Sequence, residues 1–246
     1  MRISGLHDAV VIAIILALCI SIVSSVTSAV PTGPNQVKNL STSTRTSGLS
    51  PKARGFDQRG TINTVLLNLT QQSSKWKAYI GNITGRISLD DADNYTIYDW
   101  TMGVVSGEVY ATRSSTTVNW NNIRCAKIPD VETEQAALKQ SALSSDCINR
   151  TFLDITHPAF YAGPTYISNS ICNKSANLYR NDVANAFTWH EVLLHDGTNI
   201  VYTAIINATR QGYNPNKYHD FQMLVAENGS EGVPTVNTYY FYVELT

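Results

Sequence analysis

The chain has 246 residues, of which 43% are hydrophobic and 15% are charged, and its formal net charge is −1. This length allows one sizeable core, and the near-neutral balance excludes the basic stripe of a general nucleic-acid-binding protein. A surface so poor in charge needs another source of solubility.

An apolar run at residues 9–23 follows the basic residue Arg2 and marks export through a membrane. Three fates are open for it: cleavage after Ala29, retention as a helical membrane anchor, or cleavage after Gly5. The stretch Ser4-Gly5-Leu6 before a long apolar segment resembles the prepilin-type signals of archaeal pilins and archaellins, although Ser4 stands where those signals usually carry a charge. Residues 1–29 are therefore assigned to a signal peptide or an N-terminal hydrophobic membrane or filament helix.

Residues 30–60 are rich in Ser, Thr, Pro, Gly and Asn and contain almost no large apolar side chains. This composition is typical of a linker, so we expect a tether between the N-terminal segment and a folded head at residues 61–246.

From residue 61 onward, short runs of β-branched and aromatic residues alternate with turn residues, a pattern that predicts strands. The expected strands lie at 64–69, 75–83, 85–89, 95–100, 103–112, 116–125, 151–156, 165–172, 186–194, 200–207, 220–226 and 236–245. The clearest of them form a hairpin, in which the turn 195–199 joins the strands 186–194 and 200–207.

One helix is predicted at residues 131–143, with Asp130 as its N-cap and an apolar stripe of Ala and Leu. About ten short strands with one short helix indicate an all-β fold, an antiparallel β-sandwich or flattened barrel, carried behind the N-terminal hydrophobic helix.

Eight Asn residues fit the acceptor pattern for N-glycosylation, about twice the number expected by chance in this composition. They are Asn39, Asn68, Asn82, Asn94, Asn149, Asn173, Asn207 and Asn228. Glycans at several of them would supply the solubility that the few charges do not.

The motif His190-Glu191-Val192-Leu193-Leu194-His195 differs from the zinc-protease helix because its histidines are five residues apart rather than four. On a strand, an odd separation sends the two side chains to opposite faces, so we interpret them as a surface histidine and a turn histidine. His157 and His219 are expected to make ordinary loop hydrogen bonds, because no nucleophile motif accompanies them. No cofactor and no catalytic residue is assigned, and the chain is not expected to be an enzyme.

Two further groups are candidates for binding. Asp90, Asp91 and Asp93 concentrate carboxylates in one turn, as a calcium site requires, although a solvated turn explains them without a metal. Trp76, Trp100 and Trp120 can form a stacking platform for sugar rings, although aromatic residues of strands usually fill the core.

Three cysteines follow the N-terminal segment: Cys125, Cys147 and Cys172. In an oxidising exterior, three cysteines give one disulfide and one remaining thiol. Because Cys125 and Cys172 both end strand-like runs, we favour their pairing, which leaves Cys147 free or paired between subunits.

The motifs Trp76-Lys77-Ala78-Tyr79-Ile80-Gly81-Asn82-Ile83-Thr84-Gly85 and Tyr98-Asp99-Trp100, with residues 220–227 and 239–245, resemble uncharacterised archaeal cell-surface glycoproteins. The general sequence pattern is also similar to that of archaellin and pilin head domains. This resemblance implies a compartment and a structural role, and it carries no catalytic residues.

The sequence therefore predicts an exported, N-glycosylated structural protein of the cell surface, a subunit of a filament or coat with an adhesive role. We expect it to self-associate, to contact the membrane if its N-terminal segment is retained, and to bind no nucleic acid. Two alternatives are a carbohydrate-binding module that uses exposed aromatic residues and a secreted enzyme.

Overall fold

The computed structural model describes residues 30–42, 62, 72–101, 103–183, 188–229 and 237–246. The N-terminal segment 1–29, the expected strand at 64–69 and the sequon at Asn68 lie outside these residues. Among the helices that are described, none is long and apolar enough to cross a membrane.

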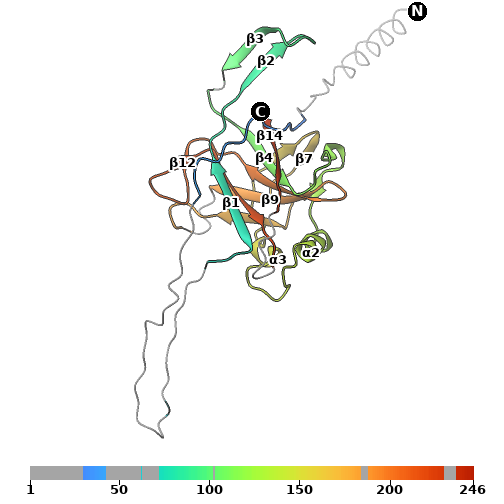
Figure 1. The fold of residues 1–246 in the computed structure, drawn as a ribbon, viewed down its shortest axis with the longest axis vertical. Coiled ribbons are helices and arrows are strands. Elements are labelled where there is room, and N and C mark those ends of the chain that lie inside the picture. The colour runs from blue at the N-terminus through green and yellow to red at the C-terminus, as the bar shows by residue number, and fades with distance from the viewer. Residues whose placement is uncertain (1–29, 43–61, 63–71, 102, 184–187, 230–236) are drawn as a thin grey trace, which may run out of the picture.

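The centre of the fold is a six-stranded antiparallel sheet (Figure 1) in the order β14, β4, β10, β9 and β5, with β8 also paired to β9. Its strands are β4 (Gly107–Thr112), β5 (Arg124–Cys125), β8 (Ser175–Leu178), β9 (Trp189–His195), β10 (Ile200–Ile205) and β14 (Tyr240–Leu245).

Four two-stranded antiparallel sheets surround this centre. They are β1 (Trp76–Gly81) with β13 (Phe221–Ala226), β2 (Arg86–Asp90) with β3 (Thr96–Thr101), β6 (Phe160–Ala162) with β7 (Thr165–Ile167), and β11 (Arg210–Gln211) with β12 (Tyr218–His219). The helices are α2 (Ile128–Ala137), α3 (Ile148–Thr151) and the 3₁₀ turn η1 (Trp120–Asn122).

Both faces of the central sheet are covered, which is why β4 has no exposed residue. Successive side chains of a strand point to opposite faces, so Val109 and Ala111 enter one hydrophobic cluster while Tyr110 enters the other. The first cluster holds residues of β13, α2 and α3, and the second holds residues of β6, β7 and η1. The predicted antiparallel all-β class is confirmed, with a central sheet between two covering layers.

The helix differs from the prediction at both ends. It begins at Ile128 because Pro129 suits the first helical turn and Asp130 accepts a hydrogen bond from the Lys127 backbone N–H at 2.8 Å, so Asp130 lies inside the helix rather than at its N-cap. It ends at Ala137, since Lys139 has a positive φ of 53° that a helix cannot continue.

Two expected strands are also replaced. Residues 148–151 form the short helix α3, in which the Cys147 carbonyl oxygen accepts bonds from the N–H groups of Arg150 and Thr151, so a strand at 151–156 is wrong except for one bridge at Asp154. Within 116–125 only Arg124 and Cys125 are strand, and the alternating Val118 and Trp120 are buried in an irregular segment.

The expected linker begins later than residue 30. Pro31 is buried, and Thr32 exchanges two backbone hydrogen bonds with Val243 on the outer edge of β14, at 3.1 and 2.7 Å. The pairing does not continue to the next bonding position on the C-terminal side, because Pro34 has no N–H to donate. The two residues Pro31 and Thr32 are therefore part of the folded body.

Candidate functional site

The β2–β3 hairpin projects from the body close to the C-terminus (Figure 1), and every residue of its two strands is exposed. Its register places Ile87 opposite Trp100 and Leu89 opposite Tyr98. Because directly opposed residues share a face, these four side chains form one apolar face, which we call the hairpin face. The rings of Tyr98 and Trp100 meet edge to face, with centroids 4.9 Å apart.

The opposed residues on the other face are polar, and Ile97, which is 80% exposed, is the extra residue where the register shifts. Arg86 lies opposite Thr101 and Ser88 lies opposite Asp99, and the Arg86 guanidinium bonds the Asp99 carboxylate at 3.0 Å. The hairpin is thus amphipathic, although no described strand pairs with either of its outer edges. An isolated two-stranded hairpin is marginally stable in water, and an exposed apolar face is typical of interaction sites, so the hairpin face is the candidate site.

The carboxylates at the hairpin tip, considered as a calcium site from the sequence, make hydrogen bonds within the turn. One oxygen of Asp91 accepts hydrogen bonds from the N–H groups of Asp93 and Tyr95, at 3.0 and 2.8 Å, and Asp90 accepts one from the Ser88 hydroxyl at 2.9 Å. Within the described part of the chain, no three His, Cys, Asp or Glu side chains are placed to hold a metal. The turn itself therefore accounts for these residues.

The three tryptophans of the expected sugar platform do not come together. Trp120 is buried between Tyr110 and Tyr242, while Trp76 packs on Phe152 and donates a hydrogen bond to the Asp146 carbonyl oxygen. Only Trp100 is exposed. A platform of these three residues is wrong, because two of them belong to the core layers.

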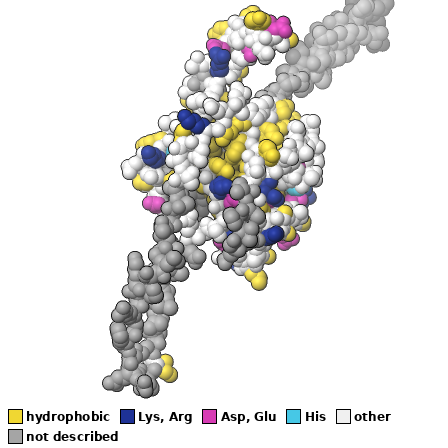
Figure 2. Space-filling model, in the orientation of Figure 1, with side chains coloured by type: hydrophobic (Ala, Val, Ile, Leu, Met, Phe, Trp, Pro, Cys, Tyr) yellow, Lys and Arg dark blue, Asp and Glu magenta, His cyan; other side chains and the backbone are white. Residues whose placement is uncertain are grey.

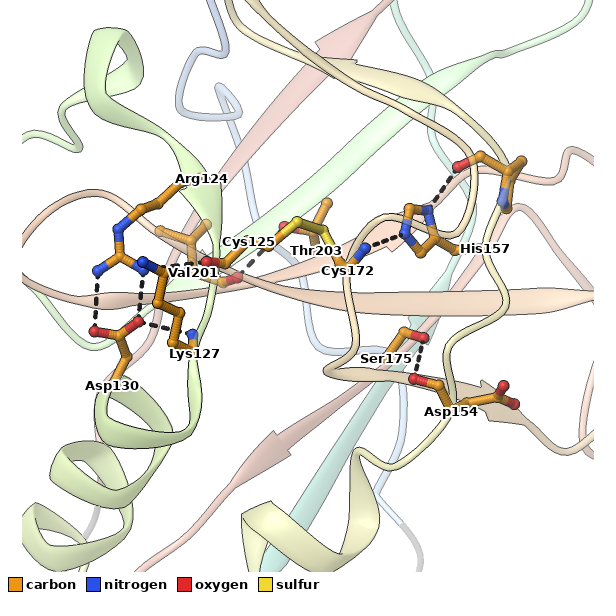
Figure 3. The surroundings of a disulfide bond; sticks show 11 residues. Arg124, Cys125, Lys127, Asp130, Asp154, His157, Cys172, Ser175, Val201 and Thr203 are labelled. Atoms are coloured by element: carbon orange, nitrogen blue, oxygen red, sulfur yellow. Dashed lines mark hydrogen bonds and ion pairs between the residues drawn. A yellow bond between two sulfur atoms is a disulfide. The ribbon is translucent and has the colours of Figure 1, made fainter.

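The disulfide joins Cys125 and Cys172, the pair favoured from the sequence, and links β5 to the layer that covers the second cluster (Figure 3). The buried ring of His157 lies beside it and accepts a hydrogen bond from the Cys172 N–H at its Nε2, 3.1 Å away. The other ring nitrogen bonds the Pro158 carbonyl oxygen at 2.8 Å. His157 thus holds the disulfide loop by ordinary hydrogen bonds. Cys147 is free and buried.

On the other side of the disulfide, a bidentate ion pair joins Arg124 to Asp130 at 2.6 and 3.0 Å (Figure 3). These hydrogen bonds hold the pKa of Asp130 down to about 2.

His195 is the last residue of β9 and is buried, so its interpretation as a turn histidine is wrong. Its Nδ1 lies 3.1 Å from Arg124 and accepts the Gly197 N–H at 3.0 Å. His190 is half-buried, with its Nδ1 3.1 Å from the Thr156 carbonyl oxygen.

Sequence reasoning missed three buried carboxyl groups in the central sheet, Glu108, Glu191 and Glu244. The pKa of Glu108 is raised to about 8 by burial and then by the adjacent Glu244, and burial also raises the pKa of Glu191. Glu244 accepts hydrogen bonds from the Tyr110 hydroxyl and the Gly163 backbone N–H, and Glu191 accepts one from the Leu224 backbone N–H. No sequence motif marks these residues, because a single Glu in an apolar run looks the same whether it is buried or lies at the edge of a strand.

The sequon side chains divide by their surroundings. Asn39, Asn82, Asn94 and Asn173 are exposed, while Asn149 and Asn207 are half-buried and hydrogen-bonded to Lys174 and to Thr188 and Arg210. Asn94 also has a positive φ of 66° at the tip of the projecting hairpin. These four exposed positions are the acceptors that a transferase can reach most directly.

Comparison of the chain with protein-family models, with curated proteins and with solved structures gives no match.

Proposed function

We propose that this chain is an exported, N-glycosylated structural protein of the cell surface, which acts by contact with other macromolecules and has no catalytic role. The hairpin face carries this proposal. Four large apolar side chains stand on a projecting element, outside both core clusters. Exposed apolar patches of a few hundred Å² often mark interaction sites. Figure 2 shows hydrophobic and acidic side chains at the outer end of the hairpin.

Other features support a location outside the cytoplasm. The bond between Cys125 and Cys172 is of the kind that persists in oxidising surroundings. Four sequon side chains are exposed, and the apolar run at 9–23 precedes a body with few charges. His157 is engaged in holding the disulfide loop, and Arg124 and Asp130 pair at the start of α2.

The test is mass spectrometry of the protein isolated from its native cell. The intact mass should exceed 27.1 kDa, or the mass of the processed chain, by whole glycan units, and the N-terminal residue should be Met1, Leu6 or Val30.

One tryptic peptide, residues 151–174, contains its own control. Asn173 lies in a sequon and should carry a glycan, whereas the exposed Asn169 is not followed by Ser or Thr at the second position and should remain unmodified. Unmodified protein in the cytosol with reduced thiols would refute the proposal.

A further inference from the structure

We infer that the hairpin face docks on the same face of a second copy of this chain. The inference deepens the proposed function, on which it rests, by naming the contact surface and its partner.

The first argument is self-complementarity. Ile87, Leu89, Tyr98 and Trp100 lie together on one face, and the Arg86–Asp99 ion pair belongs to the other. Two hairpin faces can therefore meet across a two-fold axis without removing a charged group from water, and such isologous contacts are the commonest form of self-association.

The charge at the tip argues against a lipid surface as the partner. Asp90, Asp91 and Asp93 crowd the turn, and the exposed sequon residue Asn94 follows them. Anionic lipid headgroups would repel three carboxylates, and a glycan at Asn94 would have to enter the headgroup layer. A second hairpin face is itself apolar and carries no layer of anionic headgroups, so burying it requires no glycan to enter a lipid layer.

The way the chain enters the body favours a second copy as well. Thr32 pairs antiparallel with Val243, so the residues before Thr32 run along β14 toward Leu245. Leu245 lies at the root of the hairpin, where its Cδ1 is 3.0 Å from the position of a Cβ on Gly85. Copies held through their N-terminal segments would thus present their hairpins at the same height above the common support.

The size of the hairpin face sets the strength of the contact. The four side chains are 46–60% exposed, which leaves roughly 400 Å² of apolar area on each copy. A contact of this size is at the low end of specific interfaces, so free copies should associate weakly. Copies on one support have a high effective concentration, and there the same contact suffices for assembly.

The first experiment is cross-linking of the full chain reconstituted in lipid vesicles. Leu89→Cys places a thiol on the hairpin face, and Ser88→Cys places one on the polar face one residue away. Cys19 is replaced by Ser in every chain, so that the buried Cys147 is the one native cysteine outside the disulfide. A bismaleimide that spans roughly 10 Å, the distance between two packed sheets, should then link copies of L89C but not of S88C or of the chain without either variant. Equal linking of both variants, or of neither, overturns the inference.

The second experiment is sedimentation of the full chain in density-matched detergent. Replacing Leu89 and Trp100 together by Ser should raise the dissociation constant at least tenfold, whereas Leu143→Ser, at a residue 87% exposed on the loop after α2, should leave it unchanged. The thermal midpoint reports whether the body stays folded in both variants. Unchanged association of the double variant contradicts the inference.

The lipid alternative has its own readout. In vesicles that contain brominated lipid, tryptophan quenching that disappears in Trp100→Phe would assign the hairpin face to the bilayer and overturn the inference. None of these results bears on export or glycosylation, which the mass of the native protein tests separately.

Discussion

Glu108 and Glu244 lie directly opposite each other on the neighbouring strands β4 and β14, and both carboxyl groups are buried. One oxygen of Glu244 accepts hydrogen bonds from the Tyr110 hydroxyl and the Gly163 N–H, at 2.8 and 2.9 Å. The Oε2 atom of Glu108 has no hydrogen-bond partner among the described residues. Ionising both of two adjacent buried carboxyl groups costs free energy through repulsion and desolvation, so the pair retains a proton.

We expect the free energy of unfolding to fall as the pH rises from about 4.5 to 8. The pKa of Glu108 is raised to about 8 in the folded chain from 4.5, so the unfolded chain releases a proton in this window that the folded chain keeps. The loss is complete above the folded pKa and amounts to at most about 5 kcal/mol. Thermal denaturation between pH 4.5 and pH 9 measures it.

The variant Glu108→Gln should flatten this dependence, because an amide keeps the shape of the side chain and cannot ionise. Its stability at pH 9 should exceed that of the parent chain. If the parent and E108Q show the same pH slope, the proton is held elsewhere, and Glu191 is the next residue to replace.

A second loss of stability is expected in acid. Hydrogen bonds from Arg124 lower the pKa of Asp130 from 3.8 to about 2, so the contribution of this carboxylate is present above pH 3.8 and disappears as the pH falls toward 2. Asp130→Asn should lower stability at pH 5 by about 1 kcal/mol, since it removes the ion pair with Arg124 while its amide oxygen can still accept the Lys127 N–H. The difference between the two chains should vanish near pH 2, as denaturant unfolding can show.

Reduction of the disulfide should destabilise the body strongly. The bridge closes a loop across a sequence separation of 47 residues, which corresponds to roughly 4 kcal/mol in the chain-entropy model. The midpoint of urea unfolding with and without reductant measures the effect. Cys147→Ala leaves the bridge intact, so its reductant-dependent change should equal that of the parent chain, and a smaller change would mean that another cysteine pairs.

Gly107→Ala should prevent stable folding. Gly107 has a φ of 123°, and a Cβ there would overlap the carbonyl oxygen of Glu244 on β14. The cost is several kcal/mol, because neither backbone can move without breaking the β4–β14 ladder. Gly103→Ala is the matched control, since a Cβ at Gly103 meets no atom within 4 Å. Expression with a cooperative melting transition distinguishes the two.

The sequence predicted those elements whose signal is local. The β9–β10 hairpin was predicted because turn residues separate two β-rich runs. The expected strand at 75–83 contains β1, and those at 85–89 and 95–100 overlap β2 and β3, each of which ends one residue later. Local signals failed where contacts between distant residues determine the local conformation. Trp120 alternates with polar neighbours like a strand residue, yet it lies outside the sheet and packs on Tyr110 and Tyr242.

The candidate site was only partly predictable for the same reason. The aromatic and acidic residues of the hairpin were noticed, but composition cannot tell a projecting face from a buried one, and Trp76 and Trp100 look alike in sequence. The disulfide could be favoured from strand ends, whereas the burial of Glu108 and Glu244 depends on a pairing between residues 136 positions apart. Strand pairing between residues so far apart cannot be read from a single sequence.

The attachment of Thr32 to β14 has a mechanical consequence. Tension on the chain ahead of residue 30 acts along the strand axis, because the chain leaves in the direction of Leu245, and so it loads both Thr32–Val243 bonds together in shear. β14, the edge strand of the central sheet, then bears the force before the inner strands do. We expect a pulled molecule to lose these two hydrogen bonds first, while the central sheet stays paired.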